Sequence, residues 1–251
     1  MTFDQIYSQY YDLLYKDKNY KVEVDYLIEI LGRHGQKAKS ILELGCGTGN
    51  HAKFFSEYGY KILGIDRSKD MLEIAKKRFA DDPNVTFELA EIEDYIIDKN
   101  FDAIFSLFHV ISYLNDTNSL LDTFANVSKH LKPDGLFIFD TWFGPGVLSD
   151  QPEVRMKKIK NDQIEVVRIA SPTLHIAKNV CDVNYQIYVE DFKENRIYKN
   201  EEKHSMRYFF LPEMQLMLEQ SGLVLIECLE YLKFESPKLD TWNAVFVCKK
   251  K

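Results

Sequence analysis

Short apolar runs alternate with helical stretches through the first half of the chain. The runs predict strands at 40–45, 61–66, 85–89, 101–107 and 136–141. The stretches between them predict helices near 49–57, after Ser68 as a cap, and near 117–131, where Lys132-Pro133-Asp134-Gly135 reads as a stop and turn. Earlier, residues 20–33 have a helical pattern, and residues 3–15 have nearly helical spacing with many tyrosines. Regular alternation of apolar strands with helices is typical of a parallel sheet covered on both faces.

The periodicity changes to two between residues 150 and 210. Apolar residues at 181, 183, 185, 187 and 189 alternate with polar ones, which indicates antiparallel strands with one solvated face. A helix near 212–221 and strands near 224–232 and 243–249 follow. We therefore predict an α/β, doubly wound, seven-stranded and mostly parallel Rossmann-like sheet. Its parts would be an N-terminal helical cap (1–36), a core (37–141 and 211–251) and an inserted antiparallel β layer (142–210).

Composition and charge narrow the class of protein. Acidic residues outnumber basic ones and the net charge is −7, which disfavours nucleic acid as a partner. No apolar run approaches the roughly 20 residues that span a bilayer, so no membrane association is expected. The four cysteines and the histidines show no metal-ligand spacing, so no metal site is predicted. We expect a cytoplasmic protein with reduced thiols.

The segment from Glu43 to Asn50 carries the strongest functional signal. Gly45, Gly47 and Gly49 follow a buried strand and precede a helix, and Asp66 ends the next strand. Such glycines let a small molecule approach the backbone, and a carboxylate about 20 residues downstream can accept hydrogen bonds from a ribose diol. Dinucleotide-binding loops have Gly or Ala where this chain has Asn50, which disfavours the alternative of an NAD-dependent oxidoreductase.

The loop resembles motif I of the class I S-adenosylmethionine-dependent methyltransferases. Segments 101–104 and 131–135 are similar to that family's fourth-strand motif and to its turn before strand five. The resemblance implies S-adenosyl-L-methionine as the cofactor and an enzyme rather than a non-catalytic binding protein, which remains an alternative. The cofactor-binding residues that it implies are Tyr11, Tyr20, Glu43, Gly45, Cys46, Gly47, Asp66, Arg67, Met71, Glu91, Ile92 and Leu107.

Beyond the core, the chain resembles bacterial amino-sugar N-methyltransferases, especially those acting on nucleotide-linked sugars. The similar stretches are 10–15 with Tyr20, 142–145 and 201–209. The resemblance implies a small-molecule acceptor, amine methylation, and substrate contacts from Trp142, His204 and Arg207. A histidine with a base-like role in that group is matched here by Tyr113, and His109 is the second catalytic candidate.

Several alternatives stay open. Within the same class, the alternative is O-methylation of a carbohydrate or another hydroxyl compound. Residues 240–243 replace a glycine- and arginine-bearing segment of the group, so a free as well as a nucleotide-linked sugar is considered. The protein is expected to be a monomer or a homodimer.

Overall fold

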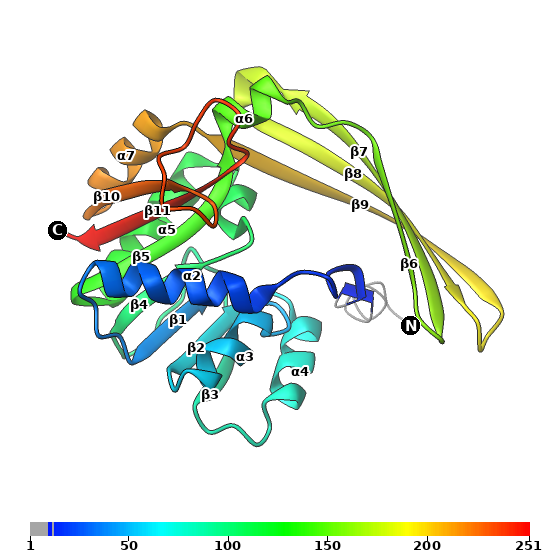
Figure 1. Ribbon diagram of the computed structural model, residues 1–251, viewed down its shortest axis with the longest axis horizontal. Coiled ribbons are helices and arrows are strands. Elements are labelled where there is room, and N and C mark those ends of the chain that lie inside the picture. The colour runs from blue at the N-terminus through cyan, green and yellow to red at the C-terminus, as the bar shows by residue number, and fades with distance from the viewer. Residues whose placement is uncertain (1–9, 12) are drawn as a thin grey trace.

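The computed structural model describes residues 10–11 and 13–251. A central β-sheet forms the middle of the fold. Within that part of the chain its strands run in the order β3-β2-β1-β4-β5-β11-β10 (Figure 1). The first five are parallel, whereas β11 is antiparallel to both β5 and β10. This confirms the predicted class of a doubly wound, mostly parallel sheet. The strands are β1 (Ser40–Leu44), β2 (Lys61–Asp66), β3 (Val85–Leu89), β4 (Phe101–Ser106), β5 (Leu131–Phe143), β10 (Leu223–Glu230) and β11 (Asn243–Lys250).

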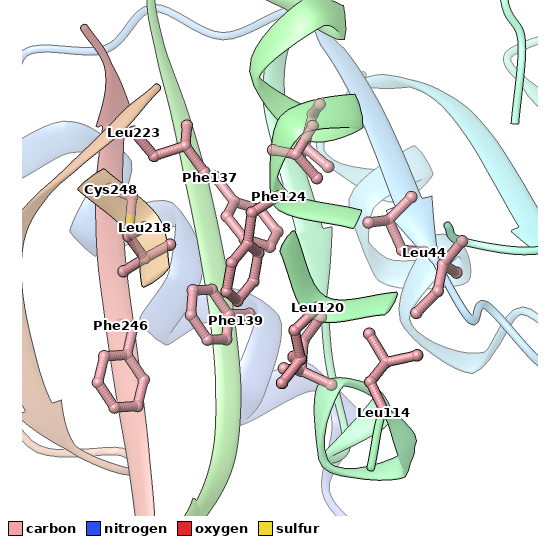
Figure 2. Packing of buried hydrophobic residues seen from close by; sticks show 14 of the residues in the cluster. Leu44, Leu114, Leu120, Phe124, Phe137, Phe139, Leu218, Leu223, Phe246 and Cys248 are labelled. Atoms are coloured by element: carbon pink, nitrogen blue, oxygen red, sulfur yellow. The ribbon is translucent and has the colours of Figure 1, made fainter. Parts of the chain in front are cut away.

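Helices cover both faces of the sheet because successive strand residues point to opposite sides. In β5, Phe137 and Phe139 pack in one core cluster with residues of α5 (Thr117–His130) and α7 (Leu211–Gln220). Figure 2 shows these rings beside Phe124 and Phe246. The intervening Leu136 and Ile138 join the opposite cluster. That cluster contains residues of α2 (Tyr20–Arg33), α3 (Asn50–Glu57) and α4 (Lys69–Arg78).

Helix starts follow the capping signals of the sequence. The Ser68 side chain accepts a hydrogen bond from the backbone of Met71, as predicted, and begins α4. Asn19 and Asp116 cap α2 and α5 in the same way. The expectation for residues 3–15 falls mostly outside the described residues, because 1–9 and 12 are not among them.

The turn predicted at 132–135 lies inside a strand. Helix α5 ends at His130 and β5 begins at Leu131, whereas the predicted strand began at 136. Phe101 pairs with Leu131 and Ala103 pairs with Leu136, so residues 132–135 bulge out of the ladder. Asp134 has φ 62°, a left-handed conformation that the bend requires. Residues 132–135 therefore bend the chain as predicted, but β5 pairs with β4 both before and after the bend.

Residues 155–209 form a long antiparallel extension that we call the arm. Its strands are β6 (Arg155–Lys160), β7 (Ile164–His175), β8 (Val180–Asp191) and β9 (Arg196–Phe209), each pairing with the next. The short helix α6 (Gly144–Ser149) precedes it, and the 3-10 turn η2 (Ile176–Lys178) joins β7 to β8. Figure 1 shows the arm curving away from the core.

The arm is joined to the central sheet. At the root of β9, Tyr208 and Phe209 pair with Trp142 and Phe143 of β5 in parallel. The antiparallel strands predicted for 150–210 are present, and the last one also pairs with a strand of the central sheet. At the other side of the arm, the N-terminal residues Tyr10 and Leu14 pack in one cluster with residues of β7 and β8. Within the described part of the chain, no helix has the length and apolarity needed to cross a bilayer.

Candidate active site

A cavity of about 800 Å³ opens where β1, β2 and β4 end. Open α/β sheets bind ligands at this edge, because the loops that follow the strands diverge there. The N-terminal segment and the arm supply the remaining walls. The predicted residues that line it are Tyr11, Tyr20, Gly45, Cys46, Gly47, Asp66, Arg67, Met71, Leu107, His109, Tyr113, Trp142 and His204.

Two glycines of the loop, Gly45 and Gly47, differ in what lies beside them. A side-chain carbon at Gly47 (φ 55°) would meet no atom within 4 Å, so the backbone there faces open space. At Gly45 (φ 71°) such a carbon would lie 2.6 Å from a methyl of Val110, in the 3-10 turn η1 (Val110–Tyr113). A side chain at Gly45 would therefore collide with the neighbouring turn, whereas Gly47 leaves open space for a ligand. Both glycines line the cavity, and their cofactor contacts stay predictions.

Asp66 is fixed beneath the glycine loop. Its carboxylate accepts hydrogen bonds from the backbone N–H groups of Gly47 and Ser68, both at 2.8 Å. Burial raises the pKa of Asp66, although these donors and Arg67 counteract the shift. Each oxygen takes one of these bonds and keeps a further lone pair, so the carboxylate can still accept from a cis-diol. The residues present therefore fit the ribose and the close backbone approach of S-adenosylmethionine.

Glu43 belongs to a buried charged cluster behind the loop. His51 of α3 lies 2.7 Å from Glu23 and 3.3 Å from Glu43, and Lys18 also contacts Glu23. Burial disfavours the imidazolium of His51, but the two carboxylates outweigh this effect and raise its pKa to about 9. The other Glu43 oxygen, Oε2, is buried and has no hydrogen-bond partner among the described residues.

His109 occupies a strained turn at the end of β4. It and Phe108 both have left-handed backbones, with φ of 62° and 63°. The carboxylate of Asp140, buried in β5, accepts from the His109 N–H at 3.2 Å and lies 2.6 Å from its Nδ1. Consecutive left-handed non-glycine residues cost free energy and occur where neighbouring structure enforces them. Asp140 provides that constraint and holds the imidazole at the cavity wall.

Tyr113 contacts the arm. Its hydroxyl lies 2.7 Å from Nδ1 of His204, and His204 Nε2 lies 2.8 Å from Oε2 of Glu202. The ring of Tyr185 packs edge-on against His204 at 5.0 Å. Desolvation raises the pKa of Tyr113, so its hydroxyl is protonated near neutral pH. The structure thus joins one predicted catalytic residue to one predicted substrate contact.

Four predicted residues lie away from the cavity lining. Besides Glu43, they are Glu91, which is exposed; Ile92, which packs in the core; and Arg207. Arg207 contacts Thr117 and Glu213 instead. Their binding roles stay predictions.

Conversely, other lining residues were not anticipated, among them Tyr15, Arg168, Tyr185 and Glu202. Period two offered a signal for Glu202, because it lies two residues from His204 on one strand and therefore on the same face. The same rule puts Arg207 on the opposite face from His204, where its side chain contacts Thr117 and Glu213.

Comparisons with known proteins agree with this geometry. A family model described as "Methyltransferase domain" matches residues 41–135. The chain is 30% identical over 146 residues to the dTDP-3-amino-3,4,6-trideoxy-alpha-D-glucopyranose N,N-dimethyltransferase of Streptomyces venezuelae; the match covers 57% of this chain and 60% of that relative. It is 25% identical over 218 residues to the dTDP-3-amino-3,6-dideoxy-alpha-D-glucopyranose N,N-dimethyltransferase of Streptomyces fradiae, covering 86% and 83% of the two chains.

Solved structures agree on the fold. An S-adenosylmethionine-dependent methyltransferase from Clostridium acetobutylicum superposes with a TM-score of 0.82 at 22% identity, covering 96% of each chain. The strand order, the loop around Gly47 and these matches favour the methyltransferase expectation over the nicotinamide alternative. Residues 41–135 match a methyltransferase domain, and the whole chain has the fold of the S-adenosylmethionine-dependent methyltransferase from Clostridium acetobutylicum.

Proposed function

We propose that the protein methylates the amino group of a nucleotide-linked amino sugar, with S-adenosyl-L-methionine as the donor. The relatives from Streptomyces venezuelae and Streptomyces fradiae carry names of dTDP-amino-sugar N,N-dimethyltransferases, which supports this acceptor class. S-adenosylmethionine supplies an electrophilic methyl group with its own leaving group, so the protein's task is to bind, orient and deprotonate the acceptor.

The observation that carries the proposal is the continuity of the cavity. Gly47 and Asp66 line it on the core side, and Trp142 and His204 line it toward the arm. Methyl transfer needs the nucleophile in line with the methyl carbon at roughly 3–3.5 Å, with water excluded. One continuous cavity between the loop and the arm allows a donor and a sugar to meet in that way.

The loop side of the cavity is the proposed donor site. Gly47 would let the cofactor approach the backbone, and Asp66 would accept from the ribose hydroxyls. Tyr11 and Tyr20, on the N-terminal side, would contact the amino-acid portion of the cofactor.

Basic side chains support a negatively charged acceptor. Arg67 comes from the end of β2, Arg168 from β7 and Lys203 from β9, and all three line the cavity. Guanidinium groups bind phosphate through paired hydrogen bonds, so Arg67 and Arg168 are the candidates for a nucleotide diphosphate. In this chain these two arginines would bind the phosphates in place of the arginine-bearing segment that residues 240–243 replace.

The direct test is turnover. The purified protein is incubated with S-adenosylmethionine and dTDP-3-amino-3,6-dideoxyglucose, and product mass is followed by mass spectrometry. We expect a mass increase of one or more methyl groups on the sugar nitrogen. The analogue with a hydroxyl in place of the amino group should remain unmodified. Methylation of that analogue alone would identify an O-methyltransferase and overturn the proposal.

Measuring the affinity for S-adenosylhomocysteine tests the methyl-donor site separately from the acceptor site. Asp66→Asn keeps the size of the side chain but removes its charge, and we expect S-adenosylhomocysteine to bind about 10-fold or more weakly in calorimetry, because hydrogen bonds to a charged acceptor are lost. Glu73→Gln, on the exposed face of α4, is the matched control. Wild-type affinity in Asp66→Asn would contradict the ribose role.

A further inference from the structure

We propose that Tyr113, His204 and Glu202 form a proton relay that deprotonates the acceptor's ammonium group before methyl transfer. This inference rests on the proposed function, because it requires an amine acceptor. It assigns a role to Glu202, a residue for which the sequence predicted none. It also assigns His204 to proton transfer in addition to substrate contact.

The relay crosses from the core to the arm. Tyr113 ends η1, which follows β4, while His204 and Glu202 lie two residues apart on β9. The Tyr113 hydroxyl lies 2.7 Å from His204 Nδ1, and His204 Nε2 lies 2.8 Å from Glu202 Oε2. All three residues line the cavity. A hydroxyl, an imidazole and a carboxylate in this order are the arrangement by which side chains activate nucleophiles in hydrolases.

Glu202 determines which imidazole nitrogen carries the proton. Its Oε1 accepts hydrogen bonds from Tyr10 Oη and Asn200 Nδ2, both at 3.0 Å. Its Oε2 is left to face His204 Nε2, so that nitrogen is the protonated one. The lone pair of Nδ1 then points at the Tyr113 hydroxyl and can receive a proton.

The proton balance is as follows. The acceptor's ammonium group gives a proton to Tyr113 Oη while the Tyr113 hydroxyl gives its own proton to His204 Nδ1. His204 becomes an imidazolium whose charge Glu202 offsets. The neutral amine then forms the nitrogen–carbon bond to the methyl group as the carbon–sulfur bond breaks, and the electron pair stays on sulfur. The proton on His204 leaves to solvent before the next transfer.

The surroundings suit this role. Tyr10 and Asn200 hold Glu202 in place, and the Tyr185 ring restricts rotation of His204. His109 lies against Asp140 through its backbone N–H and its ring, whereas the ring of His204 contacts both Tyr113 and Glu202. The titratable and charged groups that face the relay from neighbouring elements are Tyr10 and Tyr15 of the N-terminal segment, Arg67 after β2, Arg168 of β7 and Tyr185 of β8.

The tautomer of His204 tests the geometry without turnover. In Glu202→Gln, the donors Tyr10 and Asn200 keep an oxygen at the Oε1 position, so the amide nitrogen faces His204 Nε2. His204 must then carry its proton on Nδ1, which blocks acceptance from Tyr113. We expect nitrogen NMR of the labelled protein to show Nε2 protonated in the wild type and Nδ1 protonated in the variant, with His204→Gln giving the assignment. The same tautomer in both proteins overturns the relay.

The pH profile tests the chemistry. Tyr113→Phe and Glu202→Gln should each lower kcat/KM for dTDP-3-amino-3,6-dideoxyglucose by about 100-fold near neutral pH. The deficit should shrink toward high pH, because solvent then deprotonates the amine. Glu190→Gln, an exposed change on β8, is the control and should follow the wild type.

The possible failures are distinguishable. A deficit that is the same at every pH marks a structural role and overturns the relay while the proposed function stands. Absence of product from the wild-type protein overturns the proposed function itself. Affinity for S-adenosylhomocysteine, measured in each variant, should stay within about two-fold of the wild type, which separates the relay from damage to the cofactor site.

Discussion

Gly47 is the residue at which the backbone of this protein meets the cavity. Its φ of 55° is unfavourable for other residues, and no atom occupies the space that a side chain would take. Gly59 shares both properties (φ 81°) but lies in the turn after α3, outside the cavity lining. Substitutions at Gly47 and Gly59 can therefore be compared to separate the need for a left-handed backbone from the need for empty space in the cavity.

We expect Gly47→Ala and Gly59→Ala to lose similar stability, about 1 kcal/mol each, because both force a side chain into a left-handed conformation. Only Gly47→Ala should weaken S-adenosylhomocysteine binding, by about 10-fold or more, because its methyl group enters the space left for the ligand. Chemical denaturation and calorimetry measure the two effects. Equal loss of affinity in both variants would contradict the assignment of this space to the cofactor.

The buried His51 predicts a pH dependence of stability. Its folded pKa of about 9 exceeds the unfolded value of about 6.5, so the proton is bound more tightly in the folded protein. The stabilisation is complete below about pH 6.5 and is lost as the pH rises through about 9. The shift corresponds to roughly 3 kcal/mol.

Urea unfolding at about pH 7 and about pH 10 measures this contribution. His51→Gln should remove most of the loss between the two pH values. His175→Gln is the control, because His175 also contacts a carboxylate, that of Asp182, but is more exposed. An unchanged pH dependence in His51→Gln would show that other groups cause the loss.

At the scale of elements, the strands of the core were predictable because buried parallel strands are continuous apolar runs. The bulge at residues 132–135 was not, because Pro and Gly mark a bend without showing whether the strand resumes beyond it. On β9 the period of two was visible, but the sequence does not say which face meets the cavity. Glu202 was therefore missed, and Arg207, a predicted substrate contact, lies outside the cavity lining.

The arm contributes a basic side chain whose role in phosphate binding can be tested. Arg168 on β7 lines the cavity beside Tyr15 and Tyr185. Arg168→Gln should raise KM for the dTDP-linked amino sugar about 10-fold or more, because a guanidinium–phosphate contact is lost. KM for the same sugar without its nucleotide should change little. Arg155→Gln, on the exposed edge strand β6, is the control. Equal effects on both sugars would assign Arg168 to packing rather than phosphate binding.

At the scale of the molecule, the active site belongs to three parts of the chain at once. The core supplies Gly47 and Asp66, the N-terminal segment supplies Tyr11, and the arm supplies Glu202 and His204. The arm is rooted in the central sheet at Trp142 and contacts the N-terminal segment farther out. A ligand that fills the cavity contacts all three parts, so its binding free energy also stabilises their arrangement.

Hydrogen exchange should show this coupling. Saturation with S-adenosylhomocysteine should slow exchange in the glycine loop, in residues 13–20 and in residues 201–206 of β9, because opening any of these parts releases the ligand. Strand β6 contributes no residue to the cavity lining, so its exchange should stay unchanged and provides the internal control. Protection confined to residues 45–68 would show that the cofactor organises the core alone. The arm and the N-terminal segment would then be ordered by the acceptor, and adding the dTDP-linked sugar would extend protection to them.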